Sequence, residues 1–320
     1  MIVSAVEPPE AHGVSRDGVR MLVADPSGVT HAHFNDLRQF LKPGDLVVVN
    51  NSATLPAAVG NVHFSTQLDD CSWVVELRPE GTQAVAGQRV PLPSGYLELL
   101  DPYVPGRLWR AKVSVDVPTL LAEFGQPIKY SYVPGQWPIS DYQTVFAQSP
   151  GSAEMPSAGR PFSAALVTSL VSAGIAFAPI TLHTGVSSIE EGKPPLPERF
   201  QVPPSTARLV NTTRAAGGRI VAVGTTVTRA LESVASADGL VTGGEGWTEL
   251  VLGLDRPARV VNGLITGWHA PGASHLRLLQ AVAGSRLVER AYSAAGAAGY
   301  LWHEFGDSCL LLPNERPGAS

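Results

Sequence analysis

A change in the pattern of apolar residues and turns along this 320-residue chain, called here the change of texture, constrains the fold more than any other feature. Outside residues 61–141, apolar runs of strand length alternate with segments of helical periodicity. Within 61–141, short alternating runs such as WVVELRP and LWRAKVSVDV are separated by turns rich in Gly and Pro. Strand and helix in alternation are typical of a layered α/β domain, and short strands with such turns are typical of a small all-β unit. The sequence therefore predicts one domain interrupted by another.

The predicted boundaries follow this change. Residues 1–60 and 142–320 are expected to form an α/β main domain with a layered, mixed sheet, and residues 61–141 an inserted small all-β barrel domain. Within the main domain, FNDLRQFLKPGDLVVVNNS (34–52) predicts a short helix, a Pro-Gly turn and a buried strand. FSAALVTSLVSAG (162–174) predicts a helix capped by Ser163 and ended by Gly174, followed by a strand.

Composition narrows the class of protein. Charged residues make up 16% and hydrophobic residues 44%, which is typical of a globular chain. The net charge of -5 gives no global attraction to nucleic acid or to anionic lipid. An uncharged stretch at 161–182 is long enough to suggest a membrane span, but its Ser, Thr, Gly and Pro residues and its division into helix and strand argue against one.

Cysteine and histidine spacing exclude two kinds of site. Cys71 and Cys309 match neither a redox pair nor a zinc spacing, so we expect reduced, structural cysteines in a cytoplasmic protein. The histidines are not clustered at the spacing of a metal site, so the sequence predicts none. The first residues lack a basic segment followed by an apolar one, and we expect no secretory signal.

The stretch GGRIVAVGTTVTRALE (217–232) predicts a strand that turns through glycine into a helix. The first N–H groups of such a helix point outward, and the hydroxyls of Thr225 and Thr226 beside them suit an anion or a polar ligand edge. An ordinary alternative is that Thr226 or Thr228 caps the helix. The segment alone leaves both interpretations open.

Several polar groups fall at the predicted carboxyl ends of strands, where open α/β sheets bind ligands. They are Asn50, Asn51, His183, Thr225, Thr226 and His269. Arg229 and Glu232 follow on the predicted helix at a spacing that also suits a surface ion pair. Asp307 precedes the last apolar run, as a turn residue or as a site carboxylate.

These motifs resemble one known family. VGTTVTRALE (223–232) matches its V-G-T-T-x-x-R-x-L-E signature, and YQTVFA (142–147), GSAEMPSAG (151–159), LHTG (182–185), the HAP of TGWHAPGASHL (266–276) and FGD (305–307) follow in the family's order. The chain thus resembles the S-adenosylmethionine:tRNA ribosyltransferase-isomerases of queuosine biosynthesis from about Arg16 to Leu312. The family's architecture, an α/β domain interrupted by a small β-barrel, agrees with the change of texture.

The resemblance implies a transferase with S-adenosylmethionine as co-substrate and no metal. In the reaction that the resemblance implies, the ribosyl unit of S-adenosylmethionine moves onto a 7-aminomethyl-7-deazaguanine base in tRNA and isomerises, and adenine and methionine are released. The sulfonium acidifies the C5′ hydrogen, so the reaction needs a base. Candidates for acid/base catalysis are His183, His269 and Asp307. Candidates for donor binding are Gly224, Thr225, Thr226, Arg229, Ser157, Gly159 and Gly185.

The chain departs from the family's motifs at several polar positions. Histidines of the family are replaced by Pro161, Lys193 and Leu196, arginines by Ala53 and Leu301, and an asparagine by Gly267. His275 or His303 are candidates to replace the lost histidines. Lost arginines remove phosphate contacts that a tRNA partner uses. Three hypotheses follow: the family reaction, a divergent transferase acting on a free nucleobase or nucleoside, and a non-catalytic binding protein. We expect a monomer and no membrane partner.

Overall fold

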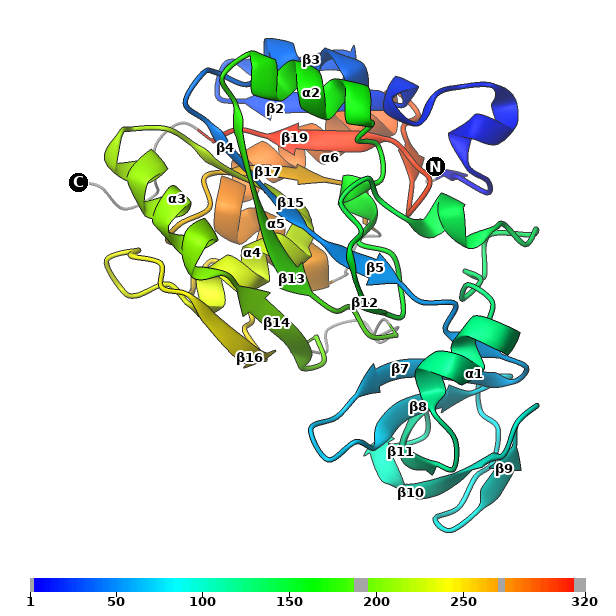
Figure 1. Cartoon of the computed structure of the whole chain (residues 1–320). Helices are drawn as coiled ribbons and strands as arrows, with labels where there is room; N and C mark the ends of the chain where they lie inside the picture. Colours follow the sequence, from blue (N-terminus) through cyan, green and yellow to red (C-terminus); the bar gives the residue numbers. More distant parts are fainter. Residues whose placement is uncertain (1–2, 187–194, 270–273, 314–320) are drawn as a thin grey trace.

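The computed structural model describes residues 3–186, 195–269 and 274–313 (Figure 1). The described residues form a large α/β unit and a smaller β unit beside it (Figure 1). The larger unit is built on a nine-stranded mixed sheet, as the sequence predicts. Its strands in spatial order are β16 (Gly244–Thr248), β14 (Glu198–Val202), β13 (Ala176–Leu182), β4 (Leu46–Asn50), β15 (Ile220–Val223), β17 (Gly263–Thr266), β19 (Ser308–Leu311), β2 (Arg20–Asp25) and β3 (Gly28–His33).

The four central strands β13, β4, β15 and β17 are parallel, so their carboxyl ends meet at one edge of the sheet. Each of the outer strands forms at least one antiparallel pair with a neighbouring strand. β19 and β2 also pair with one another, and that pair is parallel. Parallel strands buried on both faces are expected to be continuous apolar runs, and β4 and β15 are buried along their whole length.

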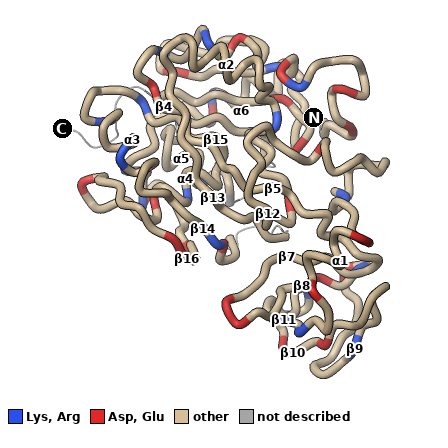
Figure 2. The backbone as a smooth tube through the Cα atoms, viewed as in Figure 1, with Lys and Arg blue, Asp and Glu red and all other residues tan. Residues whose placement is uncertain are grey.

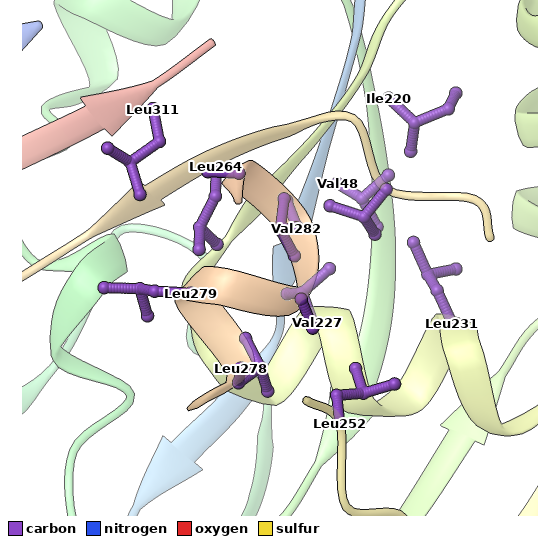
Figure 3. Packing of buried hydrophobic residues seen from close by; sticks show 14 of the residues in the cluster. Val48, Ile220, Val227, Leu231, Leu252, Leu264, Leu278, Leu279, Val282 and Leu311 are labelled. Atoms are coloured by element: carbon purple, nitrogen blue, oxygen red, sulfur yellow. The ribbon is translucent and has the colours of Figure 1, made fainter. Parts of the chain in front are cut away.

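Helices cover both faces of this sheet. On one face lie α3 (Pro204–Ala215), α4 (Gly224–Ser233), α5 (Ser274–Ala283) and α6 (Ser285–Ala297). Figure 3 shows Val227 and Leu231 of α4 and Leu279 and Val282 of α5 packed against Val48 and other strand side chains. On the other face lie α2 (Ala164–Ser172) and the 3₁₀ helix η3 (Phe34–Gln39). Alternate residues of β4 and β15 face the two cores, as strand geometry requires.

Local signals explain where α2 begins and ends. The Ser163 hydroxyl accepts a hydrogen bond from the N–H of Leu166 at 3.1 Å, which confirms the predicted cap. Gly174 follows the helix with φ +82°, a left-handed conformation that favours glycine. The predicted helix before the first buried strand is the 3₁₀ helix η3.

The smaller unit is a six-stranded antiparallel sheet with one helix. Its strands in spatial order are β6 (Ala58–Val59), β7 (Val62–Gln67), β8 (Trp73–Leu77), β11 (Leu108–Val113), β10 (Tyr96–Val104) and β9 (Arg89–Pro91), and α1 (Val117–Phe124) completes it. The strand pairing has β6 and β9 at its ends. The structure therefore confirms a separate antiparallel unit, and barrel closure remains a prediction.

Several short elements complete the described part of the chain. They are the parallel pairs β1 (Val3–Ser4) with β18 (Leu301–Trp302) and β5 (Ser52–Thr54) with β12 (Ser149–Ser152), and the 3₁₀ helices η1 (Pro9–His12), η2 (Arg16–Gly18), η4 (Ile139–Tyr142) and η5 (Ser157–Gly159). Tyr130, Tyr132 and Trp137 pack with Met155 and Phe305 of the larger unit. The predicted insert end at 141 thus lies beyond the six strands and α1.

The two units also touch directly. The hydroxyl of Ser65 on β7 accepts the N–H of Val186 at 2.9 Å, and a Cβ at Gly185 would lie 2.8 Å from that hydroxyl. Glycine at 185 therefore allows the close approach. On the neighbouring edge, the Trp247 indole donates to the carboxylate of Asp69 at 2.9 Å.

The distribution of charged residues and the length of the apolar helices agree with the expectations drawn from composition. Figure 2 shows basic and acidic residues interspersed along the chain rather than gathered by sign. None of the helices in the described part of the chain is both long enough and apolar enough to cross a bilayer.

Candidate active site

A cavity of about 580 Å³ lies where the carboxyl ends of β13, β15 and β17 face the smaller unit. Strand-end residues Thr184, Val223 and Thr266 line one side, and Ser65, Thr66 and Tyr103 of the smaller unit line another. This volume is within the range of small-molecule sites. The predicted site at the strand ends thus coincides with a ligand-sized cavity.

The first turn of α4 forms part of the cavity wall. Gly224, Thr225 and Thr226 all line the cavity. Gly224 has φ +91°, and a Cβ there would lie 3.2 Å from the Cβ of Ala158. Glycine therefore provides both the turn from β15 into α4 and the close contact with Ala158. The early N–H groups of a helix carry partial positive charge, which suits an anion or polar ligand group.

The capping interpretation of these threonines is wrong. The N-cap position of α4 is Val223, and no side chain caps this end. Thr228 lies deeper, where its hydroxyl donates to the Gly224 carbonyl at 3.2 Å. Thr226 instead receives a hydrogen bond from the Asn50 amide, at 3.4 Å. Its hydroxyl therefore faces the strand ends and the cavity.

Arg229 lines the cavity but its guanidinium is already engaged. It forms an ion pair with Glu198 and donates to backbone carbonyls, those of Leu196, Thr248 and Leu250. Burial raises the pKa of Glu198 to about 7, although the Arg229 guanidinium opposes the rise and the Glu154 carboxylate adds to it. Arg229 is therefore an anchor for the cavity wall and for Glu198.

His269 and His275 lie in the same wall and stack, with ring centroids 4.3 Å apart. The Nε2 atom of His269 lies 3.2 Å from the hydroxyl of Thr266. Burial, reinforced by His275 and His303 nearby, holds the pKa of His269 well below its ordinary value. Burial also lowers the pKa of His275. Both imidazoles are consequently neutral at pH 7 and can accept a proton.

His183 lies outside the cavity lining. Its Nδ1 is 2.7 Å from the hydroxyl of Ser52, and its ring packs closely against Gly151. Burial lowers its pKa. These contacts tie the end of β13 to β5 and β12.

Asp307 is also held away from the main cavity. Its carboxylate accepts the backbone N–H of Arg20 at 3.0 Å, two guanidinium N–H groups of Arg20 at 3.1 and 2.8 Å, and the N–H of Leu301 at 2.8 Å. It lines a second, small cavity beside the first. With both oxygens engaged, Asp307 fixes the turn between β18 and β19 rather than facing the reacting site.

Of the remaining predicted donor-binding residues, two line the cavity and one does not. Ser157 and Gly185 line the cavity. Gly159 is buried behind it, where an added Cβ would lie 3.2 Å from the Cγ2 of Thr144. Among the described residues, no group of His, Cys, Asp and Glu side chains is arranged to hold a metal ion.

Comparison with known proteins identifies the family. Residues 3–311 match the family described as queuosine biosynthesis protein. The S-adenosylmethionine:tRNA ribosyltransferase-isomerases of Heliobacterium modesticaldum and Symbiobacterium thermophilum are 35% and 34% identical, each over 93% of this chain and 94% of the relative. The chain belongs to this family.

A solved member supports the fold of this ribosyltransferase-isomerase family. The crystal structure of the S-adenosylmethionine tRNA ribosyltransferase from Thermotoga maritima aligns with a TM-score of 0.55 and 27% identity, over 97% of this chain and 96% of that one. Membership makes the chain an enzyme of the ribosyltransferase-isomerase class. The relatives support this reaction class over the small-acceptor and binding-only hypotheses.

The positions that depart from the family's motifs have different surroundings. Pro161 is buried, and the adjacent Arg160 pairs with Glu10 at 2.9 Å. Leu196 and Gly267 line the cavity. Ala53 lies on β5, Leu301 is exposed on β18, and Lys193 lies outside the described residues. Of the two candidate replacements, His275 lines the cavity, whereas His303 stacks on Tyr132.

Sequence interpretation missed two carboxylates of the site. Glu154 and Glu304 line the cavity beside Glu198. Both lie inside motifs that carry the family resemblance, GSAEMPSAG and the segment ending in FGD. For Glu154 the available signal was a carboxylate between the apolar residues Ala153 and Met155, because charged residues are rarely buried unless they are paired.

Proposed function

We propose that the cavity binds S-adenosylmethionine and that the chain transfers and isomerises its ribosyl unit onto a 7-aminomethyl-7-deazaguanine base in tRNA. The observation that carries the proposal is the Gly-Thr-Thr turn of α4, which lines a ligand-sized cavity at the carboxyl ends of parallel strands. Helix N-termini at this position of α/β sheets commonly receive polar ligand groups. The hydroxyls of Thr225 and Thr226 and the nearby N–H groups are placed to hold oxygens of the donor.

His269 is the base in this proposal. The donor's sulfonium acidifies the adjacent C5′ hydrogen, so the C–H bond breaks as the neutral imidazole takes the proton. The hydroxyl of Thr266, 3.2 Å from Nε2, orients the ring. Glu198, with a pKa of about 7 beside Arg229, is suited to return a proton to a leaving group near neutral pH. His183 and Asp307 position the strand end and the turn behind the site.

The partners follow from the same reaction. The proposal includes tRNA as the acceptor, the cytoplasm as the compartment and a monomer as the acting form. The smaller unit closes one side of the cavity. We further propose that its sheet curls into a small barrel, since side chains of β6, β7, β8, β10 and β11 share one core with α1.

The decisive experiment separates donor binding from turnover. Calorimetric titration with S-adenosylmethionine measures binding, and mass spectrometry then measures adenine and methionine released with tRNA carrying the deazaguanine base. Unmodified tRNA of the same sequence is the control. Release that requires the modified base supports the proposal. Release with a free nucleobase alone, or binding without release, contradicts the tRNA acceptor.

Thr226→Val tests the donor role of the α4 turn. Valine preserves shape but removes the hydroxyl, so we expect the affinity for S-adenosylmethionine to fall by about 3- to 10-fold, the loss of one hydrogen bond. Thr228→Val is the matched control, because its hydroxyl bonds inside the helix. Calorimetry on both variants measures the difference. Equal affinities for wild type and Thr226→Val would remove the hydroxyl from the donor site.

A further inference from the structure

The Glu304 carboxyl is the most unusual polar group in the cavity wall. It lies where the main cavity meets the small second cavity, and it lines both. Its Oε2 atom is buried and has no hydrogen-bond partner among the described residues. Buried carboxylates are almost always paired or hydrogen-bonded, so an open position on Glu304 calls for a partner that the described residues do not supply.

A tight turn between β18 and β19 holds Glu304 in this place. His303 has φ +73°, an uncommon conformation for a residue other than glycine. The N–H of Gly306 donates to the His303 carbonyl at 2.9 Å, and the N–H of Asp307 donates to the Leu301 carbonyl at 2.8 Å. A Cβ at Gly306 would lie 2.5 Å from the Leu301 carbonyl oxygen. The turn is therefore closely constrained, and its geometry directs Glu304 to the cavity.

The surroundings of Glu304 favour a cation. Within the described ranges no side chain, basic or otherwise, forms a hydrogen bond with its Oε2 atom. The titratable groups near Glu304 include the Glu154 carboxylate, the Tyr130 phenol and the His303 imidazole. Burial, followed by the carboxylates of Glu304 and Glu154, raises the pKa of Tyr130. Burial lowers the pKa of His303. Burial raises the pKa of Glu304 itself to about 7. A cationic group beside Glu304 would offset this cost of burying its charge.

We propose that Glu304 binds a primary ammonium group of a substrate. A buried carboxylate oxygen without a partner accepts most strongly from a charged donor, and an ammonium combines a positive charge with N–H groups, whereas a sulfonium has no hydrogen to donate. Two substrate groups carry this chemistry: the α-ammonium of the methionine part of the donor and the aminomethyl group of the acceptor base. The inference rests on the proposed function for these substrates, but it concerns binding and can be tested without turnover.

Glu304→Gln is the central variant. Glutamine has the same shape and no charge, and a side chain with a pKa of about 7 is already neutral in part of the molecules at pH 7, so the fold tolerates the change. We expect a loss of about 10- to 100-fold in affinity for whichever ligand places its ammonium there, the scale of a charge-assisted hydrogen bond. Glu289→Gln, at an exposed carboxylate on α6, is the matched control.

Three ligands distinguish the sources. Calorimetry is run with S-adenosylmethionine, with the dimethylsulfonium analogue of adenosine that lacks the amino-acid part, and with the free base 7-aminomethyl-7-deazaguanine. If Glu304 binds the donor, the variant loses affinity for S-adenosylmethionine and binds the analogue as wild type does. If it binds the acceptor, only affinity for the free base falls.

Proton release gives a second readout that a merely structural role would not change. Because burial raises the pKa of Glu304 to about 7, some of the Glu304 side chains carry a proton near neutral pH, and an arriving ammonium expels it, so wild type releases a fraction of a proton per ligand bound. Titrations in buffers of different ionisation enthalpy measure this number, and Glu304→Gln should abolish it.

The inference fails if Glu304→Gln binds all three ligands with wild-type affinity and releases as many protons on binding as wild type does. Failure of the proposed function has a different signature: no tRNA-dependent adenine release by wild type. Loss of ammonium-dependent binding in the variant would uphold the role of Glu304 even in that case.

Discussion

His269→Ala is expected to lower kcat for adenine release by about 10²- to 10⁴-fold, the contribution of a positioned base. Affinity for S-adenosylmethionine should stay within about 3-fold, because the donor-binding groups on α4 are unchanged. The removed imidazole is the one whose buried, neutral state and contact with Thr266 suit proton abstraction. Steady-state assays of adenine release measure kcat, and calorimetry on the same preparations measures the affinity.

His183→Ala is the comparison that makes this result specific. His183 bonds to Ser52 outside the cavity lining, so its loss should lower kcat by less than about 10-fold through small displacement of the strand end. If His183→Ala loses as much activity as His269→Ala, or if His269→Ala stays active, the base is misassigned.

Arg229→Met is expected to lower the free energy of unfolding by about 3–5 kcal/mol, the cost of leaving a buried charge unpaired. Methionine fills most of the volume but provides no partner for Glu198 or for the carbonyls of Thr248 and Leu250. Urea denaturation followed by circular dichroism measures the change. Arg219→Met is a control of a different kind, because it removes an ion pair to Asp45 far from the cavity.

The pH dependence of this variant follows from Glu198. Burial already raises its folded-state pKa from 4.5 to about 7, so the folded protein binds more protons than the unfolded chain in that window. Such a group reduces stability as pH rises from about 4.5 to 7, and removing Arg229 raises the pKa further. The destabilisation should therefore be larger at pH 8.5 than at pH 5.5. Glu198→Gln in the Arg229→Met background should recover stability at the higher pH; no recovery would contradict the unpaired-charge explanation.

Local patterns in the sequence predicted much of the fold. The alternation of strand and helix and the cap at Ser163 are fixed by neighbouring residues, and each has its counterpart in the structure. The boundary after Gly60 stays a prediction, and β6 (Ala58–Val59) of the smaller sheet precedes it. Barrel closure and the end of the insert depend on contacts distant in sequence. The aromatic residues between Tyr130 and Tyr142 pack on Met155 and Phe305 for this reason, although they lie within the predicted insert.

The sequence by itself determined the family and predicted a site at the strand ends, because the V-G-T-T motif and the polar strand ends are short-range signals and parallel strands bring their carboxyl ends to one edge. Only the tertiary structure decided which polar residues face the cavity. His183 is engaged by Ser52 and Asp307 by Arg20, partners 131 and 287 residues away along the chain. Within the described part of the chain, the Oε2 atom of Glu304 has no such partner. A side chain's availability for chemistry depends on what the fold places beside it, and that information is not local.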